Sequence, residues 1–346
     1  RDLHSLNFAL EFCKILFIKI ARKYCFRAQR KTGRICTMEK KRLITRSDFD
    51  GLVCAMLLKE LDMIDEIKFV HPKDVQDGKI DITENDITTN LPFDPRVGLA
   101  FDHHESEIIR TDHEDFGDKY ICICEKSAAR VVYNYYGGAD TFKTVTEEIM
   151  VAVDKGDSAD FTVDEILNPT DWVLMNFVMD ARTGLGRFHD FRISNYQLMM
   201  ELIDYCTNHT VQEVLELPDV KERTDLYFEQ QELFKQQLKE NVKIYDKVAV
   251  LDLRPLETIY AGNRFMIYAM WPEVEMSVHV AWGFKKQNTA VMIGKSIVNK
   301  NGTCDIGELC LVYGGGGHTN AGTCQLANDE VDAALPDIST RLNEHE

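Results

Sequence analysis

Residues 42–51 read Arg-Leu-Ile-Thr-Arg-Ser-Asp-Phe-Asp-Gly, and this stretch decides the fold. Its start, residues 42–45, predicts a short buried strand, and residues 47–51 predict a turn. The apolar run from Leu52 to Leu61 that follows predicts a helix. A strand, a tight turn and a helix in this order are the opening of a βαβ unit.

The same alternation continues along the first half of the chain. We expect further strands at residues 67–70, 86–89 and 97–101, and a further helix at residues 127–136. Alternating strands and helices are typical of a parallel sheet that is covered by helices on both faces. The predicted fold class is therefore α/β, and we expect ligands at the carboxyl ends of the strands, where such sheets bind them.

The second half of the chain has a different amino-acid composition. Residues 191–245 are polar and rich in Glu, Gln and Lys, which predicts a helical connector with one break at Pro218. The apolar segments after it predict a smaller, mixed α/β domain that ends in a helix from about Glu330. The expected segments are an extension (residues 1–37), a parallel-sheet domain (38–190), the connector (191–245) and the smaller domain (246–346).

The N-terminal extension differs from the rest of the chain in its charge. Residues 1–37 contain nine Lys or Arg but only two acidic residues, and their apolar part is too short and too charged for a transmembrane span. Three interpretations remain open: a basic amphipathic helix on anionic lipid, an unstructured arm, or sequence upstream of a start at Met38. We favour the last, because Met38 leads directly into the first strand.

Composition limits the possible functions. The 57 Asp and Glu exceed the 40 Lys and Arg, giving a net charge of −17, which argues against binding duplex DNA through its phosphates. Any phosphate should therefore be bound locally, by metal ions or a few side chains. The ten cysteines are scattered and form no Cys-x-x-Cys pair, which favours a reduced, cytoplasmic chain without stable membrane insertion.

Acidic side chains and histidines follow two of the predicted strands directly. Asp48 and Asp50 lie in the first turn, and converging carboxylates repel each other unless a cation lies between them. An Asp at the start of a helix is also an ordinary N-cap, so this pair alone is a weak signal. Asp102, His103 and His104 follow a later strand, and two adjacent histidines can contact a metal and a ligand oxygen. Together the two motifs predict a metal site.

A third acidic group follows the apolar run at residues 151–153. We favour Asp154 as a ligand because it is nearest to the end of that run, whereas Asp157 and Asp160 are equally consistent with solvated loop residues. Carboxylates and imidazole without thiolate suit Mn²⁺ or Mg²⁺.

Four consecutive glycines, Gly314–Gly317, precede His318. Such a run has a large entropic cost, so we expect its backbone to approach an anionic ligand and to donate N–H groups to it. A flexible linker is the alternative, but predicted strands and a helix flank the run.

The Ser47–Gly51 turn, the Asp102-His103-His104 triplet, Asp154 and the glycine run with its histidine occur in an order that resembles the DHH phosphoesterase superfamily. The resemblance covers residues 41 to about 326 and is greatest to the exopolyphosphatase-related and nano-RNase branch. It implies a DHH catalytic domain, a DHH-associated substrate-binding domain and an active-site cleft between them. It also implies two Mn²⁺ ions, or Mg²⁺, and a small phosphorylated substrate.

The resemblance implies a role for each matching residue. Asp48, Asp50, His103 and Asp154 would bind metal, His104 would face the phosphoryl group, and the Asp102-His103-His104 triplet would be catalytic. The substrate-binding residues that it implies are Lys295, Ser296, Gly315, Gly316, Gly317, His318 and Asn320.

Two positions depart from the family pattern. Ile44 stands where many relatives have a histidine, and the second motif's bridging carboxylate could be Asp86 or be replaced by Asn90. A neutral amide at that place would weaken the binding of two metals.

The expected activity is metal-dependent hydrolysis of a phosphodiester or phosphomonoester in a small nucleotide or short oligonucleotide, without a covalent enzyme intermediate. Exopolyphosphatase-like cleavage is an alternative, disfavoured because no basic track is obvious. A catalytically impaired nucleotide-binding or sensor protein is a second alternative. The resemblance leaves a homodimer open.

Overall fold

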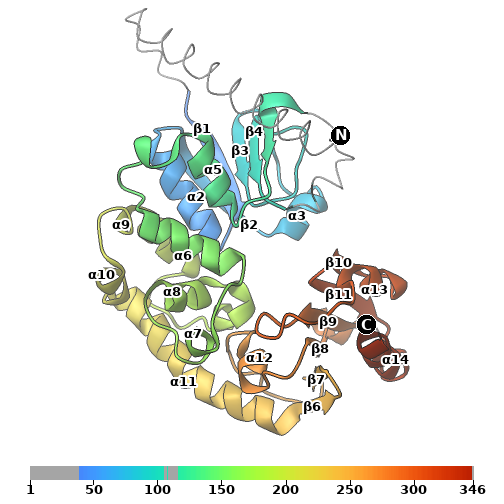
Figure 1. Cartoon of the computed structure of the whole chain (residues 1–346). Coiled ribbons are helices and arrows are strands. Elements are labelled where there is room, and N and C mark those ends of the chain that lie inside the picture. The colour runs from blue at the N-terminus through green and yellow to red at the C-terminus, as the bar shows by residue number, and fades with distance from the viewer. Residues whose placement is uncertain (1–38, 105–106, 108–115, 345–346) are drawn as a thin grey trace, which may run out of the picture. The chain divides into compact units, whose positions relative to one another are not determined.

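A computed structural model describes residues 39–104, 107 and 116–344 (Figure 1). The expectations for residues 1–37 lie outside the described residues. Two sheets organise the described part of the chain, one of five strands and one of six. Within that part, no helix combines the length and the apolar character needed to cross a bilayer.

The first sheet has the order β2-β1-β3-β4-β5, and each neighbouring pair is parallel. Its strands are β1 (Lys41–Arg46), β2 (Ile64–Val70), β3 (Asp86–Thr89), β4 (Leu99–Asp102) and β5 (Tyr120–Cys122). The chain runs from β1 outward to β2 and then returns to β3 on the other side of β1. The carboxyl ends of β1 and β3 therefore form the switch point of the sheet, where open parallel sheets bind ligands.

The two central residues of β1 point to opposite faces of this sheet. Leu43 and Ile44 are both fully buried, but Leu43 belongs to the apolar cluster under α2 (Phe49–Glu60), whereas Ile44 packs with Val75 of α3 (Pro72–Gln76). Alternation of this kind is what a strand covered on both faces requires. The predicted α/β fold is confirmed.

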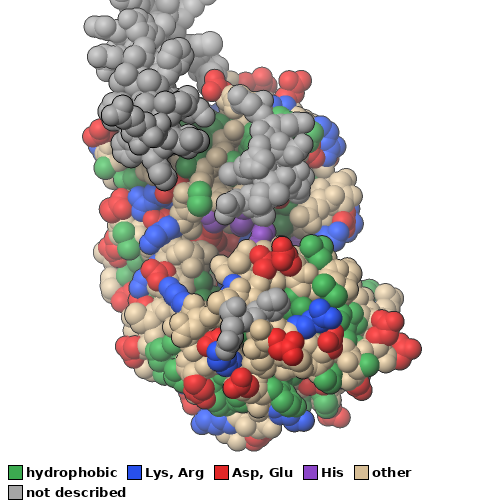
Figure 2. Space-filling model, turned by 45° about the vertical axis from the view of Figure 1, so that its right-hand side comes forward, with side chains coloured by type: hydrophobic (Ala, Val, Ile, Leu, Met, Phe, Trp, Pro, Cys, Tyr) green, Lys and Arg blue, Asp and Glu red, His purple; other side chains and the backbone are tan. Residues whose placement is uncertain are grey.

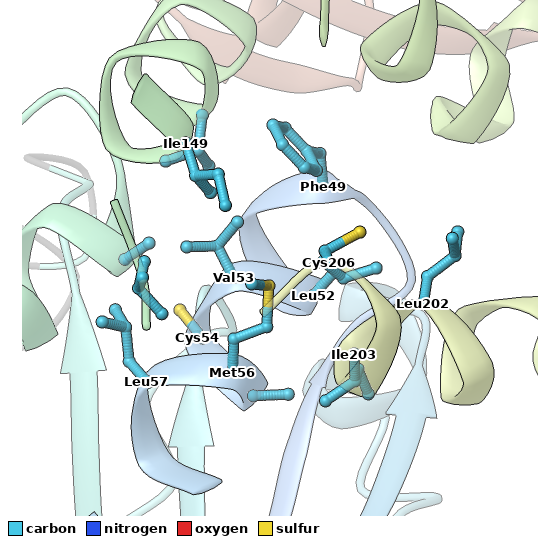
Figure 3. Close-up of a cluster of buried hydrophobic side chains, with 14 of the residues drawn as sticks. Phe49, Leu52, Val53, Cys54, Met56, Leu57, Ile149, Leu202, Ile203 and Cys206 are labelled. Atoms are coloured by element: carbon cyan, nitrogen blue, oxygen red, sulfur yellow. The ribbon is translucent and has the colours of Figure 1, made fainter. Parts of the chain in front are cut away.

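Helix α2 is the centre of the larger core. It packs against α5 (Ala128–Tyr135), α6 (Glu147–Asp157) and α9 (Asn195–Tyr205). Figure 3 shows Val53 of α2 beside Ile149 of α6, and Met56 of α2 beside Ile203 of α9. Since α2 is buried over most of its surface, its first turn and the acidic groups there are held rigidly.

Helices and short 3₁₀ turns connect the two sheets. The helices are α7 (Val163–Leu167), α8 (Asp171–Met179), α10 (Val211–Leu215) and the long α11 (Pro218–Asn241), which begins at the predicted break. Pro218 occupies the first turn of α11, where a missing N–H costs nothing.

The second sheet has the order β10-β11-β9-β8-β7-β6 and is mixed, because only β7 and β8 pair in parallel. Its strands are β6 (Val242–Tyr245), β7 (Val248–Asp252), β8 (Met276–Trp282), β9 (Thr289–Lys295), β10 (Gly316–His318) and β11 (Ala321–Leu326). The helices of this region are α12 (Met266–Met270), α13 (Ile306–Val312) and α14 (Val331–Glu344).

Candidate active site

The turn between β1 and α2 positions the first acidic side chain. Asp48 caps α2, since its carboxylate accepts a hydrogen bond from the Gly51 N–H at 3.0 Å. Its other oxygen lies 2.9 Å from Nε of Arg46. Gly51 is required because a Cβ there would lie 2.0 Å from the Arg46 carbonyl oxygen. The Asp-Phe-Asp-Gly motif is therefore a packing constraint as well as a candidate ligand pair.

Asp50 points into the protein and is only 2% exposed. Its two oxygens accept hydrogen bonds from the N–H groups of Ala128 (3.1 Å) and Ala129 (2.8 Å), at the start of α5. Burial, with the neighbouring charge of Asp157, raises the pKa of Asp50 well above its usual range. A cation bound beside Asp50 would favour its ionised form.

His103 faces these carboxylates. Its Nδ1 lies 3.2 Å from the carbonyl oxygen of Glu125, which can only accept, so Nδ1 carries the proton. Its Nε2 lies 2.8 Å from a carboxylate oxygen of Asp157. Although burial lowers the pKa of His103, the charges of Asp157 and Asp50 raise it to about 10. Nε2 of His103 and the facing oxygen of Asp157 both carry lone pairs, so a proton or a metal ion must lie between these two atoms.

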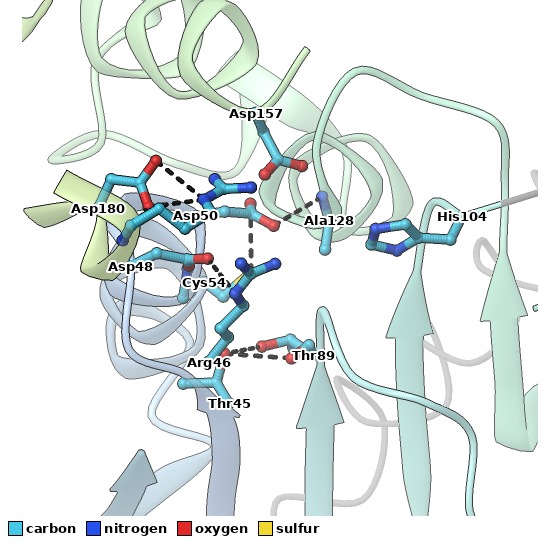
Figure 4. Close-up of polar contacts among 12 residues, drawn as sticks. Thr45, Arg46, Asp48, Asp50, Cys54, Thr89, His104, Ala128, Asp157 and Asp180 are labelled. Carbon is cyan, nitrogen blue, oxygen red and sulfur yellow. Dashed lines mark hydrogen bonds and ion pairs between the residues drawn. The ribbon is translucent and has the colours of Figure 1, made fainter. Parts of the chain in front are cut away.

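The donor set fits a divalent cation. Asp50, His103 and Asp157 each offer a ligand atom, and the three atoms lie within 4.8 Å of one another. Figure 4 shows Asp157 beside Asp50, with Asp48 next to them. Two carboxylates and an imidazole, with no thiolate, are typical ligands of Mn²⁺.

His104 belongs to a second group of potential ligands, together with Asp102 and His103. Its Nδ1 lies 2.8 Å from an oxygen of Asp102, a carboxylate that is 1% exposed. This hydrogen bond directs the Nε2 of the half-buried His104 ring away from Asp102. Figure 2 shows histidine side chains near the middle of one face of the molecule, with acidic side chains beside them.

Asn90 stands at the carboxyl end of β3. Since Thr89 pairs with both Thr45 of β1 and Phe101 of β4, the next residue lies between the ends of these strands. The Asn90 side chain is 2% exposed, and neither of its amide atoms has a hydrogen-bond partner among the described residues. A buried amide without partners is costly, and its oxygen is an acceptable metal ligand. Asn90 is therefore the better candidate for the ambiguous position.

The contacts of the alternative residue, Asp86, do not favour it for that position. Asp86 begins β3 and so lies at the opposite end of the strand from Asn90. Its carboxylate receives Nε and Nη2 of Arg42 at 2.7 and 3.0 Å, and the N–H of Thr83 at 2.7 Å. Asp86 therefore forms a structural ion pair with Arg42. The sequence could not show this, because it left the bounds of β3 ambiguous.

Asp154 also needs correction. Residues 147–157 form helix α6, so the apolar run at 151–153 does not end at a sheet edge. Asp154 accepts hydrogen bonds from Ser127 Oγ and Arg130 Nε, both at 2.8 Å, and so ties α6 to the start of α5. Asp157, the last residue of α6, takes the place that we expected for Asp154. An i, i+3 spacing puts the two on neighbouring positions of one helix face, one turn apart.

Three charged residues of the site were not predicted from the sequence. Arg46 pairs with Asp48, and Asp180 and Arg182 line the same pocket as Asp48, Asp50 and Asp157. Arg46 lies two residues before Asp48, a proximity that could have suggested it. Asp180 and Arg182 have no motif around them that would have done so.

The residues expected to bind substrate lie around the carboxyl end of β9. The Lys295 N–H donates to the Asn320 carbonyl oxygen at 2.9 Å, so these two residues are neighbours. Ser296 is 4% exposed, and its hydroxyl accepts from the N–H groups of Val298 and Asn299. Ser296 therefore supports the turn after β9, and Lys295 and Asn320 remain candidates for substrate contact.

The glycine run is divided between a turn and a strand. Gly314 has a φ of +70°, and a Cβ on Gly315 or Gly317 would lie 2.2 or 2.4 Å from the backbone of β11. The fold thus explains three of the four glycines. Gly316 has ordinary φ and open space around it, so it remains the candidate for a close approach to an anion. The His318 ring that follows lies 6.2 Å from the His104 ring, between centroids.

A buried cluster of carboxylates and imidazoles lies at the switch point of a parallel sheet, and its ligand atoms suit a divalent cation. No family model and no curated protein matches the chain. Among solved structures, it is similar to the pGpG-specific phosphodiesterase PggH from Vibrio cholerae. That match has 52% identity over 89% of this chain and 100% of that chain, with a TM-score of 0.76.

Two further structures are more distant. One is an exopolyphosphatase-related protein from Bacteroides fragilis, with 14% identity over 88% of this chain and 94% of that one, and a TM-score of 0.48. The other is RecJ from Thermus thermophilus in complex with Mn²⁺. That match has 15% identity over 88% of this chain and 52% of that one, with a TM-score of 0.42.

The chain belongs to the DHH phosphoesterase superfamily, as its 52% identity to PggH over 89% of its length shows. The predicted family and enzyme class are confirmed: the chain is a divalent-metal-dependent phosphohydrolase.

Proposed function

We propose that this chain hydrolyses the phosphodiester bond of a linear, 5′-phosphorylated dinucleotide of the pGpG type. The observation that carries the proposal is the 52% identity to a pGpG-specific phosphodiesterase over that protein's full length. The acidic and histidine cluster supplies the groups that the reaction needs.

The proposed metal ligands are Asp48, Asp50, His103, Asp157 and Asn90. They would hold two Mn²⁺ ions, with His103 and the carboxylates supplying charge and Asn90 an amide oxygen. Bound divalent ions make water a nucleophile at neutral pH and neutralise charge on the phosphoryl oxygens. Cations held by this negatively charged cluster would explain how so acidic a chain accepts a phosphate at this place.

His104 would assist the reaction beside the metal ligands. Because Asp102 is buried and its carboxylate lies 2.8 Å from Nδ1, it fixes the orientation of the His104 ring. Nε2 of that ring would then face a phosphoryl oxygen, and would stabilise the charge that develops there when it carries a proton. In hydrolysis, the water oxygen bonds to phosphorus, the P–O3′ bond breaks, and the proton ends on the 3′ oxygen. No side chain forms a covalent intermediate.

The second sheet supplies candidate contacts to the rest of the substrate. Lys295 offers a positive charge, Asn320 an amide, and Gly316 and His318 a short strand with open space at the glycine. We also infer a cytoplasmic protein that does not bind duplex DNA, in keeping with its acidic composition.

The test is a hydrolysis assay with Mn²⁺ on pGpG, cyclic di-GMP, 3′-phosphoadenosine 5′-phosphate and polyphosphate. We expect conversion of pGpG to GMP, little turnover of the other three, and loss of activity with EDTA. His103→Ala serves as the inactive control, and Arg96→Gln, an exposed arginine paired with Asp94, as the matched active control. Preferential cleavage of polyphosphate would support the exopolyphosphatase-like alternative and contradict the proposal.

A further inference from the structure

Two arginines share one carboxylate beside the metal centre. Asp180 follows α8, and its Oδ1 accepts from Nε of Arg182 at 2.7 Å and from the N–H of that residue at 2.9 Å. The other oxygen of Asp180 lies 3.8 Å from Nε of Arg264. One carboxylate thus faces two guanidinium groups, and the cluster Asp180–Arg182–Arg264 keeps one positive charge in excess.

This arginine cluster opens onto the proposed metal ligands. Asp180 and Arg182 line the same pocket as Asp48, Asp50 and Asp157. Figure 4 shows Asp180 next to Asp48 and Asp50. A ligand held at the metal centre would therefore meet Arg182 with another part of its structure, and Arg264 lies close by, 3.8 Å from the shared Asp180 carboxylate.

The backbone holds the two arginines in a fixed relation. The Gly262 N–H donates to the Thr183 carbonyl oxygen at 2.9 Å, which joins the segment before Arg264 to the segment after Arg182. Beneath them, the rings of Phe161, Phe177 and Phe265 pack with centroid distances of 4.8 and 5.9 Å. A site on such a rigid support loses little entropy when it binds a ligand.

Arg264 is not satisfied by the contacts around it. Its guanidinium lies over the Phe265 ring at 4.2 Å, and its Nε is buried without a hydrogen-bond partner in the described part of the chain. Burial and the charge of Arg182 lower the pKa of Arg264 to about 10. The side chain of Arg264 is 35% exposed, but its buried Nε and its distant, shared carboxylate leave its charge incompletely paired, and an anionic ligand would complete that pairing.

We propose that Arg182 and Arg264 bind a second phosphate of the substrate, one that is not hydrolysed, and that Asp180 positions them. The inference rests on the proposed function, and it assigns to this cluster the 5′-terminal phosphate of the linear dinucleotide. Guanidinium groups suit this task because their N–H donors match the oxygens of a phosphate in pairs. The cluster thereby selects a 5′-phosphorylated dinucleotide over one that lacks the terminal phosphate.

The test compares kcat/KM for pGpG with kcat/KM for GpG, which lacks only that phosphate. We expect the wild-type chain to prefer pGpG by at least about tenfold, which corresponds to about 1.4 kcal/mol for a charged hydrogen bond. Arg264→Gln and Arg182→Gln should each reduce this preference several-fold, because kcat/KM for pGpG should fall more than kcat/KM for GpG. Arg264→Lys should keep part of the preference for pGpG, and the control Arg96→Gln should leave that preference unchanged.

Equal losses for both dinucleotides, or an unchanged preference in both variants, would overturn the inference. Arg182, whose side chain is 47% exposed, provides a folded variant if Arg264→Gln does not fold. Calorimetry can measure the binding of pGpG and GpG to a His103→Ala chain, with and without Arg182→Gln. These affinities report the contribution of the arginine cluster to binding in the absence of turnover. Failure of the wild-type chain to cleave either dinucleotide contradicts the proposed function. In that case, equal binding of the two dinucleotides contradicts the arginine cluster as well.

Discussion

The two ends of the first sheet treat buried acidic groups in opposite ways. At the amino end, Asp86 receives Arg42 and Thr83, and these hydrogen bonds lower its pKa despite burial. At the carboxyl end, burial and like charge raise the pKa of Asp50, and Asn90 has no partner among the residues that the structure describes. Satisfied groups stabilise a fold, whereas groups left short of partners mark the place where a ligand completes them. The two ends of β3 therefore differ in role: Asp86 at its start belongs to a structural ion pair, and Asn90 after its end belongs to the proposed metal centre.

The largest effect should follow from the carboxyl end. Asp157→Asn removes a charge that faces His103 at 2.8 Å, and we expect kcat with Mn²⁺ to fall at least about 100-fold, more than for a residue that only orients a ligand. Thermal unfolding should change little in the metal-free chain, because the substitution also removes repulsion with Asp50. Steady-state assays with calorimetric measurement of Mn²⁺ affinity check both points. Full activity in this variant would contradict the assigned ligand set.

Arg42→Met should have the reverse profile. It leaves the Asp86 carboxylate buried without its main partner, which should cost about 3 kcal/mol of unfolding free energy. Urea denaturation at pH 7 measures the loss, and activity per folded molecule should stay near that of the wild type. A loss of Mn²⁺ affinity equal to that of Asp157→Asn would show that the two ends are not separate.

The ion pair at the amino end also predicts a pH dependence. Because the pKa of Asp86 is lowered in the fold, the unfolded chain binds its proton first as the pH falls. The stability from this pair should be complete above about pH 4, the ordinary pKa of Asp, and should be lost at lower pH. The difference in unfolding free energy between wild type and Arg42→Met should therefore shrink below that pH. A constant difference down to pH 3 would argue against the ion pair.

Asp154→Asn tests whether Asp154, one turn before Asp157 in α6, is itself a metal ligand. Asp154 orients Ser127 and Arg130 at the start of α5, whose N–H groups bind Asp50, so it acts on the metal centre only indirectly. We expect about a tenfold loss in kcat, as for residues that support a metal ligand. A loss as large as that of Asp157→Asn would restore Asp154 as a ligand.

The smallest effect concerns Asn90, a neutral side chain at the carboxyl end of β3. Asn90→Asp replaces the amide with a negatively charged side chain of similar size. We expect Mn²⁺ to bind several-fold more tightly, since the affinity of oxygen-ligand sites rises with ligand charge. Calorimetric titration with Mn²⁺ measures the change, and Asn85→Asp, at an exposed position before β3, is the control. Unchanged affinity would place Asn90 outside the metal centre.

The sequence was informative wherever a motif fits within a single turn. The Asp48–Gly51 turn and the Asp102-His103-His104 triplet each follow a strand directly, so their position at the sheet edge follows from the strand alone. Asp157 was harder, because the apolar run before Asp154 does not distinguish the end of a buried strand from the interior of a helix. The choice between Asp86 and Asn90 depended on where a four-residue strand begins. Arg182 and Arg264 meet only through tertiary packing, which no local pattern encodes.

The most direct test of the metal centre is anomalous scattering from crystals of the chain soaked with Mn²⁺. We expect a Mn²⁺ peak whose ligands include Asp50, His103 and Asp157, near the carboxyl ends of β1 and β4. A peak on Asp154 or Asp86 instead, or no bound Mn²⁺ in crystals of active protein, would contradict it.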